Sequence, residues 1–494
     1  MPSYILAIDQ GTTSSRAILF NQDLTVLTTA QEEFQQHFPQ NGWVEHDPED
    51  LWQTVLRTCR AVISEAQIDP ADITSIGITN QRETTLIWDR QSGVPVYPAI
   101  VWQDRRTAEL CRQLAVEGLE PTFQEKTGLL LDPYFSVTKI RWILDQDPQL
   151  QQRAELGELA FGTVDSYLLW RLTRGQSHAT DATNAARTML FDIHRHRWST
   201  TLMQALNIPE ALLPEVKDCA AEFGVSDAEW FGAEIPIRSM IGDQQAALVG
   251  QACFAPGMIK STYGTGCFAV VNTGSQPVIS RHRLLTTIGY RLNGQTTYAL
   301  EGSIFMAGAV MQWLRDGLGI LKHAKDSADM AADIGYDQSE LMVPAFTGLG
   351  APYWDPDARA AIFGMTRDTG PKQLVAAALR SVALQTQDLL MAVQQDGIAV
   401  KNMRVDGGMV RNPWFMQALA DLTGVTTVVG QTSETTVQGV AMLAALQNGW
   451  FKDLDELSQL WREAGSCQPQ LPAAQRALIV NRWQDAISKV RTNP

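Results

Sequence analysis

The first apolar runs of the chain are short, β-rich and separated by polar turns. Strand-like segments occupy residues 4–8 (YILAI), 16–20 (RAILF) and 25–30 (TVLTTA). The turn between the first two, DQGTTSS (9–15), is small and rich in hydroxyl groups. Alternating apolar and polar runs joined by such turns are typical of hairpins, so this region is predicted to be a β-meander.

The same pattern returns about half a chain later. MIKSTY (258–263) and FAVVNTG (268–274) flank a second small turn, Gly264-Thr265-Gly266. Gly264 follows Gly11 by 253 positions in a chain of 494 residues. We therefore expect two related domains, residues 1–252 and 253–494.

Helical and strand-like segments alternate between and after these hairpins. Asp47 and Pro48 begin a helical pattern with an N-cap and a first-turn proline. This alternation predicts an α/β fold with mixed or parallel sheets, whose ligands bind at the carboxyl ends of strands. The remaining segments are strands at 75–81, 84–89, 403–408 and 425–430, and helices at 107–115, 306–316, 371–395, 413–424 and 435–449.

Composition narrows the class of protein. Hydrophobic residues make up 45% of the chain and the net charge is −15, which disfavours binding to nucleic acid or to anionic membranes. No apolar run reaches the ~18 residues of a membrane helix, and the first residues lack the features of a signal peptide. Six scattered cysteines form no CxxC pair, so we expect reduced thiols and no zinc site. A cytoplasmic protein is predicted.

The first turn has the parts of a phosphate-binding loop. The chain has no Walker A motif, and GTGCFA is followed by a strand pattern, so a dinucleotide site is not supported. In DQGTTSSR, Asp9 ends a strand and Gly11 allows close approach of the backbone. The hydroxyl-rich residues that follow could hold phosphates, and Asp9 could hold hydrated Mg²⁺. An ordinary β-turn rich in Thr and Ser explains one such hairpin equally well, but the presence of a second hairpin of this kind favours phosphate binding.

VDGG (405–408) ends a strand just before a helix that follows Asn412. A flat ring could stack on this glycine backbone. Taken alone, Gly407 and Gly408 are explained as well by an ordinary turn.

Nine motifs, in one order from about residue 4 to 450, closely resemble the glycerol kinases of the FGGY carbohydrate kinase family. This resemblance implies two ribonuclease-H-like domains, as in the actin-like ATPases, with a nucleotide cleft between them. The motifs are DQGTTSSR (9–16), NQRETT (80–85), WQDRRT (102–107), LDPYFSVTK (131–139), GTVDSYLLWRLT (162–173), GDQQAALVGQ (242–251), TYGTGCF (262–268), GLGAPYWDP (348–356) and VDGG.

The resemblance also assigns roles to residues. Asp243 matches the catalytic base. The glycerol ligands it implies are Arg82, Glu83, Tyr134, Asp243 and Gln244, with Trp102 and Phe268 as an apolar wall. The nucleotide contacts it implies are Thr12, Thr13, Ser14 and Arg16 in the first hairpin, then Thr265, Gly308, Gln312, Gly408 and Asn412, with Asp9 near Mg²⁺.

The implied reaction is the ATP-dependent phosphorylation of glycerol to sn-glycerol 3-phosphate, by direct in-line transfer, in glycerol catabolism. Relatives form dimers and tetramers, so self-association is expected. A kinase for a pentulose or another polyol is the alternative within the fold. An actin-like filament or chaperone-type ATPase would also use both hairpins, but it would leave Asp243 and the polyol ligands unexplained.

Some positions depart from the family pattern. The run WFGAEIPIRS lacks the arginine that accompanies inhibition by fructose 1,6-bisphosphate, and no histidine lies between His196 and His282 where some relatives are phosphorylated. Neither form of control is expected. Arg380 and Gln438 replace an acidic and a small residue on two helices, where packing or subunit contacts are the expected consequence. The tail after about residue 465 diverges most.

Overall fold

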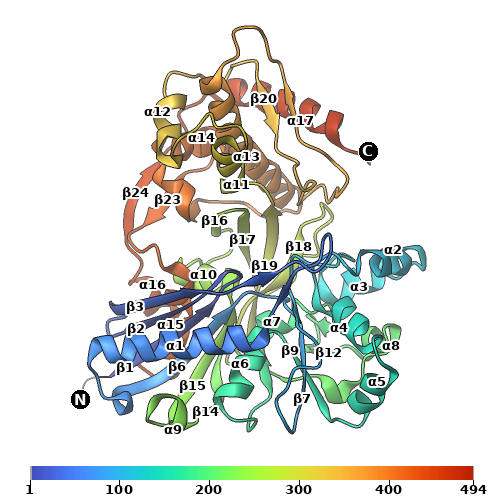
Figure 1. The fold of residues 1–494 in the computed structure, drawn as a ribbon. Coiled ribbons are helices and arrows are strands. Elements are labelled where there is room, and N and C mark those ends of the chain that lie inside the picture. Colours follow the sequence, from blue (N-terminus) through green and yellow to red (C-terminus); the bar gives the residue numbers. More distant parts are fainter. Residues whose placement is uncertain (1–2, 493–494) are drawn as a thin grey trace.

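A computed structural model describes residues 3–492, and within them the chain builds two large mixed sheets (Figure 1). The first contains, in spatial order, β14 (Ala220–Ser226), β15 (Ile235–Gly242), β6 (Ile73–Asn80), β1 (Tyr4–Gln10), β2 (Ser14–Phe20) and β3 (Val26–Glu33). The second contains β18 (Leu285–Leu292), β19 (Gln295–Ile304), β17 (Cys267–Gly274), β16 (Ile259–Tyr263), β22 (Met403–Asp406), β23 (Thr427–Gly430) and β24 (Glu463–Cys467).

The two sheets repeat one topology. In the first, β1 pairs antiparallel with β2 and parallel with β6, and β6 pairs parallel with β15. In the second, β16 pairs antiparallel with β17 and parallel with β22, and β22 pairs parallel with β23. The predicted α/β class and the duplicated hairpin are therefore confirmed.

Helices and short strands surround these sheets. The helices are α1 (Pro48–Ala66), α2 (Ala108–Val116), α3 (Glu120–Thr127), α4 (Ser136–Leu144), α5 (Pro148–Glu155), α6 (Val164–Leu172), α7 (Ala182–Ala185), α8 (Thr200–Ala205), α9 (Ala228–Phe231), α10 (Asp243–Gly250), α11 (Gly308–Gln312), α12 (Ser327–Ala331), α13 (Pro371–Gln395), α14 (Pro413–Thr423), α15 (Thr435–Gln447), α16 (Leu454–Ser458) and α17 (Ala473–Val490). The short strands are β4 (Gln36–His37), β5 (Glu45–His46), β7 (Leu86–Asp89), β8 (Ala99–Ile100), β9 (Leu159–Gly162), β10 (Ala179–Asp181), β11 (Phe191–Asp192), β12 (Arg197–Trp198), β13 (Glu215–Lys217), β20 (Leu341–Val343) and β21 (Ala361–Phe363).

Both faces of the first sheet are buried. Leu6 and Ile8 of β1 belong to the core that contains the apolar face of α1, whereas Ile5 and Ala7 belong to the core around α10 and α15. This alternation follows from the period of two along a strand. The predicted cap of α1 is confirmed, because the Asp47 side chain accepts a hydrogen bond from the Glu49 N–H.

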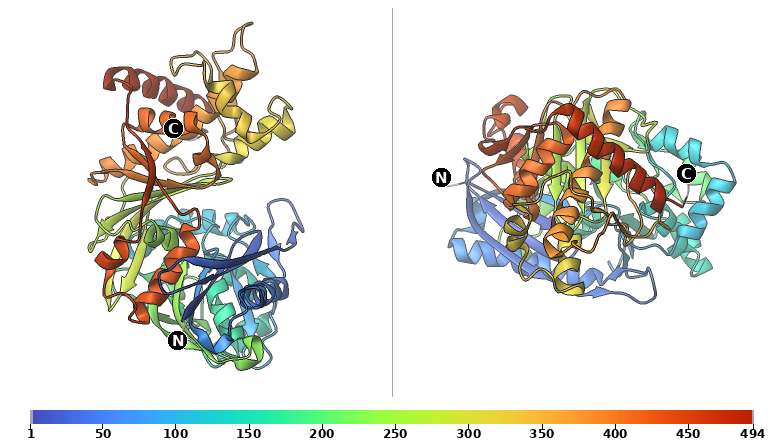
Figure 2. Two further views of the ribbon diagram at one scale, coloured as in Figure 1. Left: turned by 90° about the vertical axis from the view of Figure 1, so that its left-hand side faces the viewer. Right: turned by 90° about the horizontal axis from the view of Figure 1, so that it is seen from above.

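The chain returns late to the first sheet. Residues 253–494 include α15, yet this helix packs on β1, β6, β15 and α10. Figures 1 and 2 show α15 beside the blue strands of the lower body, below the body that contains α13, α14 and α17. We call the body that contains the first sheet, α10 and α15 the first body, and the body that contains the second sheet, α13, α14 and α17 the second body. Chain segments before β16 and after β23 link the two bodies.

Two features expected from composition can be compared with the structure. Between residues 3 and 492, no helix has the length and apolar character needed to span a bilayer. The six cysteines are free thiols, and all except Cys467 are buried.

Arg380 is buried on α13 and donates to the carbonyl oxygens of Tyr336 and Glu340, so this departure from the family pattern contributes to packing.

The carboxyl ends of the central strands meet at one edge of each sheet. Gln10 and Gly242 both lie opposite Asn80, so β1, β6 and β15 end side by side. In the second sheet Thr262 lies opposite Asp406, so β16 and β22 do the same. The turns that follow these strands, together with the strand or helix that comes next, contain most of the predicted site residues.

Glycines allow α10 and α15 to cross at close range. A Cβ atom on Gly250 would lie 1.9 Å from the Thr435 carbonyl oxygen, and one on Gly439 would lie 1.9 Å from that of Ala246. Both distances are far below van der Waals contact, so the crossing requires glycine at these two positions.

We predict that Gly439→Ala lowers the melting temperature by several degrees, because the helices must move apart to admit the methyl group. Overpacking of this kind costs about 1–3 kcal/mol. Gly465→Ala is the control, since nothing lies within 4 Å of a Cβ there. Thermal unfolding of the two variants checks this, and equal melting temperatures would contradict it.

Candidate active site

The β1–β2 hairpin presents the first group of predicted residues. Its turn is closed by a 2.9 Å hydrogen bond from the Gly11 N–H to the Ser14 carbonyl oxygen. Thr13 is exposed and Thr12 is half-buried. The Arg16 guanidinium forms an ion pair with Glu434, which immediately precedes α15. The hairpin therefore combines hydroxyl groups with one arginine.

Asp9 lies beside this turn, opposite Arg16 in the β1–β2 register. Burial raises the pKa of its carboxyl to about 7, although Arg16 opposes the shift, and the negative charges of Asp243 and Glu434 add to it. Asp9 is thus an acidic group without enough positive charge around it.

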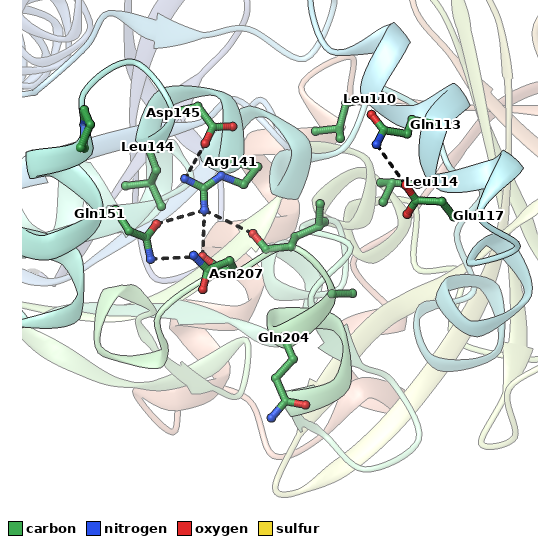
Figure 3. Close-up of a pocket in the computed structure, with 13 residues that line it drawn as sticks. Leu110, Gln113, Leu114, Glu117, Arg141, Leu144, Asp145, Gln151, Gln204 and Asn207 are labelled. Atoms are coloured by element: carbon green, nitrogen blue, oxygen red, sulfur yellow. Dashed lines mark hydrogen bonds and ion pairs between the residues drawn. The ribbon is translucent and has the colours of Figure 1, made fainter.

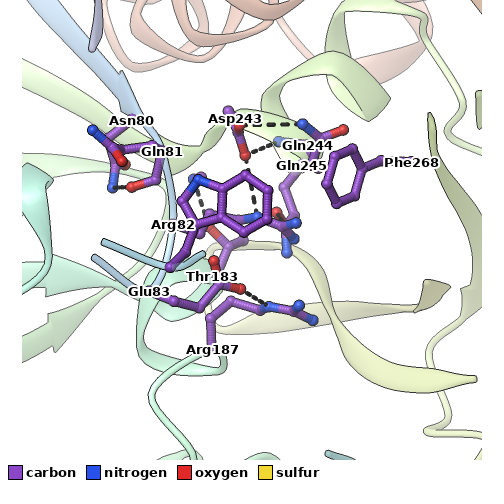
Figure 4. Close-up of polar contacts among 12 residues, drawn as sticks. Asn80, Gln81, Arg82, Glu83, Thr183, Arg187, Asp243, Gln244, Gln245 and Phe268 are labelled. Atoms are coloured by element: carbon purple, nitrogen blue, oxygen red, sulfur yellow. Dashed lines mark hydrogen bonds and ion pairs between the residues drawn. The ribbon is translucent and has the colours of Figure 1, made fainter. Parts of the chain in front are cut away.

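A second group gathers around Arg82, which follows β6 (Figure 4). Its Nε lies 3.1 Å from Oδ1 of Asp243, the first residue of α10. Its Nη2 donates to the Tyr134 hydroxyl at 3.3 Å. The Gln244 N–H also donates to Asp243 Oδ1, at 2.7 Å. These contacts fix the Asp243 carboxylate, whose side chain keeps 28% exposure.

Three aromatic rings form one wall beside these polar groups. The Trp102 ring centroid lies 5.6 Å from that of Tyr134 and 6.1 Å from that of Phe268, with edge-to-face geometry in both pairs. The Trp102 indole N–H donates to the Thr12 hydroxyl at 2.9 Å. The wall is therefore joined directly to the first hairpin.

Three charged residues that the sequence analysis did not single out complete this group. Glu301 on β19 binds Arg82 and Arg187. Arg187 in turn binds Glu83 (Figure 4). Lys260 on β16 donates to the Gln244 side-chain oxygen at 2.5 Å. Lys260 and Glu301 each appear in the sequence as a single charge inside a strand-like run, IKSTY and YALEGSI. Arg187 follows α7 and has no such signal.

The β16–β17 hairpin presents the third group. Its turn is closed by a 2.9 Å hydrogen bond from the Gly264 N–H to the Gly266 carbonyl oxygen. The start of α11 docks on it, because the Gly308 N–H donates to Gly264 at 2.8 Å. A Cβ on Gly308 would lie 2.6 Å from that same oxygen. Thr265 is left exposed at the tip.

The remaining predicted residues lie on the second body. Gly407 has φ +94°, and a Cβ there would lie 2.4 Å from the Tyr263 carbonyl oxygen, whereas Gly408 faces open space. Asn412 caps α14 by accepting from the Phe415 N–H at 2.9 Å. Gln312 is exposed on α11, and the predicted helix over 306–316 is α11 continued by a π-helical turn, Trp313–Gly317.

A separate hollow of about 620 Å³ lies on the first body, between α2, α4 and the end of α8 (Figure 3). It is lined by Leu110, Leu114 and Leu144, among others, and by Arg141. The Arg141 guanidinium is already bound to Asp145 and to the Asn207 carbonyl oxygen. None of the predicted site residues, all within residues 3–492, lines this hollow.

Comparison with known families agrees with this geometry. Residues 4–250 match the N-terminal domain of the FGGY family of carbohydrate kinases, and residues 259–447 match its C-terminal domain.

Similar proteins extend the match to the whole chain. Glycerol kinase 1 of Pseudomonas aeruginosa is 56% identical over 492 residues, and a glycerol kinase of Marinomonas sp. is 57% identical, each with 100% of both chains covered. The crystal structure of Plasmodium falciparum glycerol kinase with ADP has a TM-score of 0.93 at 34% identity, covering 100% of this chain and 99% of that one. The chain therefore belongs to the FGGY family of carbohydrate kinases, and within it the similarity to glycerol kinases extends over its full length.

Proposed function

We propose that this chain is an ATP-dependent glycerol kinase that makes sn-glycerol 3-phosphate by direct in-line transfer. The observation that carries the proposal is the group formed by Arg82, Tyr134 and Asp243 beside the wall of Trp102 and Phe268. A small triol needs polar partners for its hydroxyls and an apolar surface for its carbon chain, and this group supplies both.

Asp243 is proposed as the general base. Its carboxylate accepts the proton of the substrate hydroxyl while that oxygen forms a bond to the γ-phosphorus of ATP and the bond to the ADP oxygen breaks. Arg82 at 3.1 Å and the Gln244 N–H at 2.7 Å hold the carboxylate for this task. Positioning and charge neutralisation supply the rate enhancement, with no covalent phosphoenzyme.

The two hairpins are proposed to hold the phosphates of ATP, which is a substrate here. Thr12, Thr13, Ser14 and Arg16 would contact them from the first body, and Thr265 from the second. Arg16 must then exchange Glu434 for a phosphate oxygen. Gly308, Gln312, Gly408 and Asn412 are proposed as nucleoside contacts, and the open space at Gly408 leaves room for a flat ring.

The residues around Asp9 fit a hydrated Mg²⁺. The described residues contain no group of three His, Cys, Asp or Glu side chains that could cage a metal, but Mg²⁺ commonly binds through one or two carboxylates, waters and substrate phosphates. Burial raises the pKa of the Asp9 carboxyl, and Arg16 alone does not provide the positive charge that would offset this shift. A bound Mg²⁺ would supply that charge and help neutralise the phosphates.

Several sequence expectations stay predictions. These are self-association, a cytoplasmic location, the absence of the two forms of control, and the division into residues 1–252 and 253–494. The solved xylulose kinase of Lactobacillus acidophilus, with a TM-score of 0.90 at 19% identity, shares the fold and does not decide between glycerol and a pentulose.

The decisive test is ADP release by the purified protein with MgATP and each of glycerol, dihydroxyacetone, erythritol, xylulose and ribulose. We expect glycerol to be turned over far faster than the others. A preference for a pentulose would overturn the substrate, and ATP hydrolysis indifferent to all polyols would favour the ATPase alternative.

Asp243→Asn keeps the shape of the side chain and removes the base. We predict that kcat falls by roughly 10²-fold or more, while glycerol binding measured by calorimetry is largely retained. Near-normal turnover in the purified variant would show that another group accepts the proton.

Asp9→Asn tests the charge at the proposed Mg²⁺ site. The folded pKa is about 7 against an ordinary value of 3.8, so the wild-type protein loses stability as the pH rises from 3.8 through 7. We predict that the variant melts several degrees above wild type at pH 8 without Mg²⁺, and that this gain shrinks toward pH 5. The exposed Asp23→Asn is the control. An equal gain at both pH values would contradict the assignment.

A further inference from the structure

Two of the proposed glycerol ligands, Arg82 and Glu83, form a buried group of four charges with Arg187 and Glu301. Arg82, Glu83, Arg187 and Glu301 have side chains that are at most 2% exposed. Arg187 Nε lies 2.6 Å from Glu83, and Arg187 Nη2 lies 2.9 Å from Glu301 Oε1. Glu301 Oε2 lies 2.5 Å from Arg82 Nη1. Two cations and two anions thus form one balanced chain, which we call the charge cluster.

Glu301 is the centre of the charge cluster. Burial opposes its negative charge, but Arg187 and Arg82 outweigh that effect and lower the pKa of its carboxyl to about 2. Arg82 donates to both of its oxygens, and Arg187 donates to Oε1 as well. Glu301 is therefore ionised, and it fixes two guanidinium groups relative to each other.

The charge cluster joins the two bodies. Glu301 lies on β19 of the second sheet, one strand away from Phe268 on β17. Arg82 and Glu83 follow β6 of the first sheet, and Arg187 follows α7. The side chains that would bind the polyol are thus held from both sheets.

Glu83 has a strained backbone conformation, which hydrogen bonds from neighbouring residues hold in place. Glu83 has φ +61°, and the Thr84 N–H donates to the Arg82 carbonyl oxygen at 2.7 Å, which closes a γ-turn. The hydroxyls of Ser136 and Thr85 both donate to the Glu83 carbonyl oxygen at 3.0 Å. Strain at a site persists only where neighbours hold it, so this turn fixes the directions in which Arg82 and Glu83 leave the chain.

We infer that Glu301 and Arg187 are specificity-determining positioning residues: they hold Arg82 and Glu83 so that only a polyol with matching hydroxyls binds well. The inference rests on the proposed glycerol kinase function. Its physical basis is that fixed, buried polar groups strongly reject an analogue that leaves one of them without a partner. A mobile Arg82 would adapt to other polyols and would lose more conformational freedom on binding glycerol.

The test is Glu301→Gln, which keeps the side-chain shape and removes its charge. Steady-state kinetics with glycerol, propane-1,2-diol and propane-1,3-diol measure the discrimination between the triol and its analogues. We expect the KM for glycerol to rise at least tenfold, the glycerol-to-diol ratio of kcat/KM to fall at least tenfold, and the KM for MgATP to change less than twofold. Arg187→Lys should change these values in the same direction.

Asp388→Asn is the control for the replacement of a buried carboxyl by an amide away from the charge cluster. Asp388 is buried on α13 and binds Trp483 and Gln484, on the second body. This variant should leave the KM for glycerol and the glycerol-to-diol ratio of kcat/KM unchanged. If Glu301→Gln behaves the same way, Glu301 is only structural and the inference is overturned.

A further variant tests the inference if Glu301→Gln does not fold. Glu301→Asp keeps the charge but withdraws the carboxylate by one methylene, and it should raise the KM for glycerol to an intermediate value. Unchanged glycerol constants in Glu301→Asp and Arg187→Lys would also overturn the inference. Wild-type protein that does not phosphorylate glycerol would overturn the proposed function itself, which separates the two failures.

Discussion

Parallel pairing of β1, β6 and β15 is the constraint on which the site depends. Parallel strands end at the same edge of a sheet, so the residues that follow them meet without any long-range motif. Gln10 and Gly242 share Asn80 as their cross-strand neighbour, which brings the first hairpin, Arg82 and Asp243 to one edge. Polar side chains also link the segments at this edge. The Gln81 side chain donates to the Gln10 side-chain oxygen at 3.0 Å and to the Gly11 carbonyl oxygen at 3.0 Å, which ties the segment after β6 to the first hairpin.

Charge divides this edge into two parts with opposite requirements. Around Arg82 the charge cluster is balanced, since Glu301 and Arg187 neutralise their neighbours within the protein. Around Asp9 the balance is incomplete, and burial together with Asp243 and Glu434 raises the pKa of its carboxyl to about 7. A neutral polyol suits the first part. The second part would suit the proposed nucleotide if it arrives with its own cation, because that cation would compensate both Asp9 and the phosphates.

The sequence predicted the architecture and most of the residues at this edge. Local patterns sufficed for the duplicated hairpins, for α1 with its Asp47 cap, and for the alternation of helices and strands. They could not find Glu301 or Arg187, because the partners of these residues lie more than 100 positions away and on other elements. The return of α15 to the first sheet was equally invisible, since its contact with α10 depends on the crossing at Gly250 and Gly439 rather than on a local signal.

Burial differs between the two sides of the site, and this difference follows from where the charge cluster lies. Arg82, Glu83 and Glu301 are almost fully buried, and the ion pairs of Glu301 with Arg82 and Arg187 cross from the second sheet to the first body. Thr265, Gly408 and Gln312 are exposed on turns and helix ends of the second body. Breaking a buried ion pair costs several kcal/mol, so separating the bodies is costly at the charge cluster and cheap at the exposed turns. We therefore expect relative movement of the bodies to change the surroundings of Thr265, Gly408 and Gln312 most and to leave the charge cluster in place.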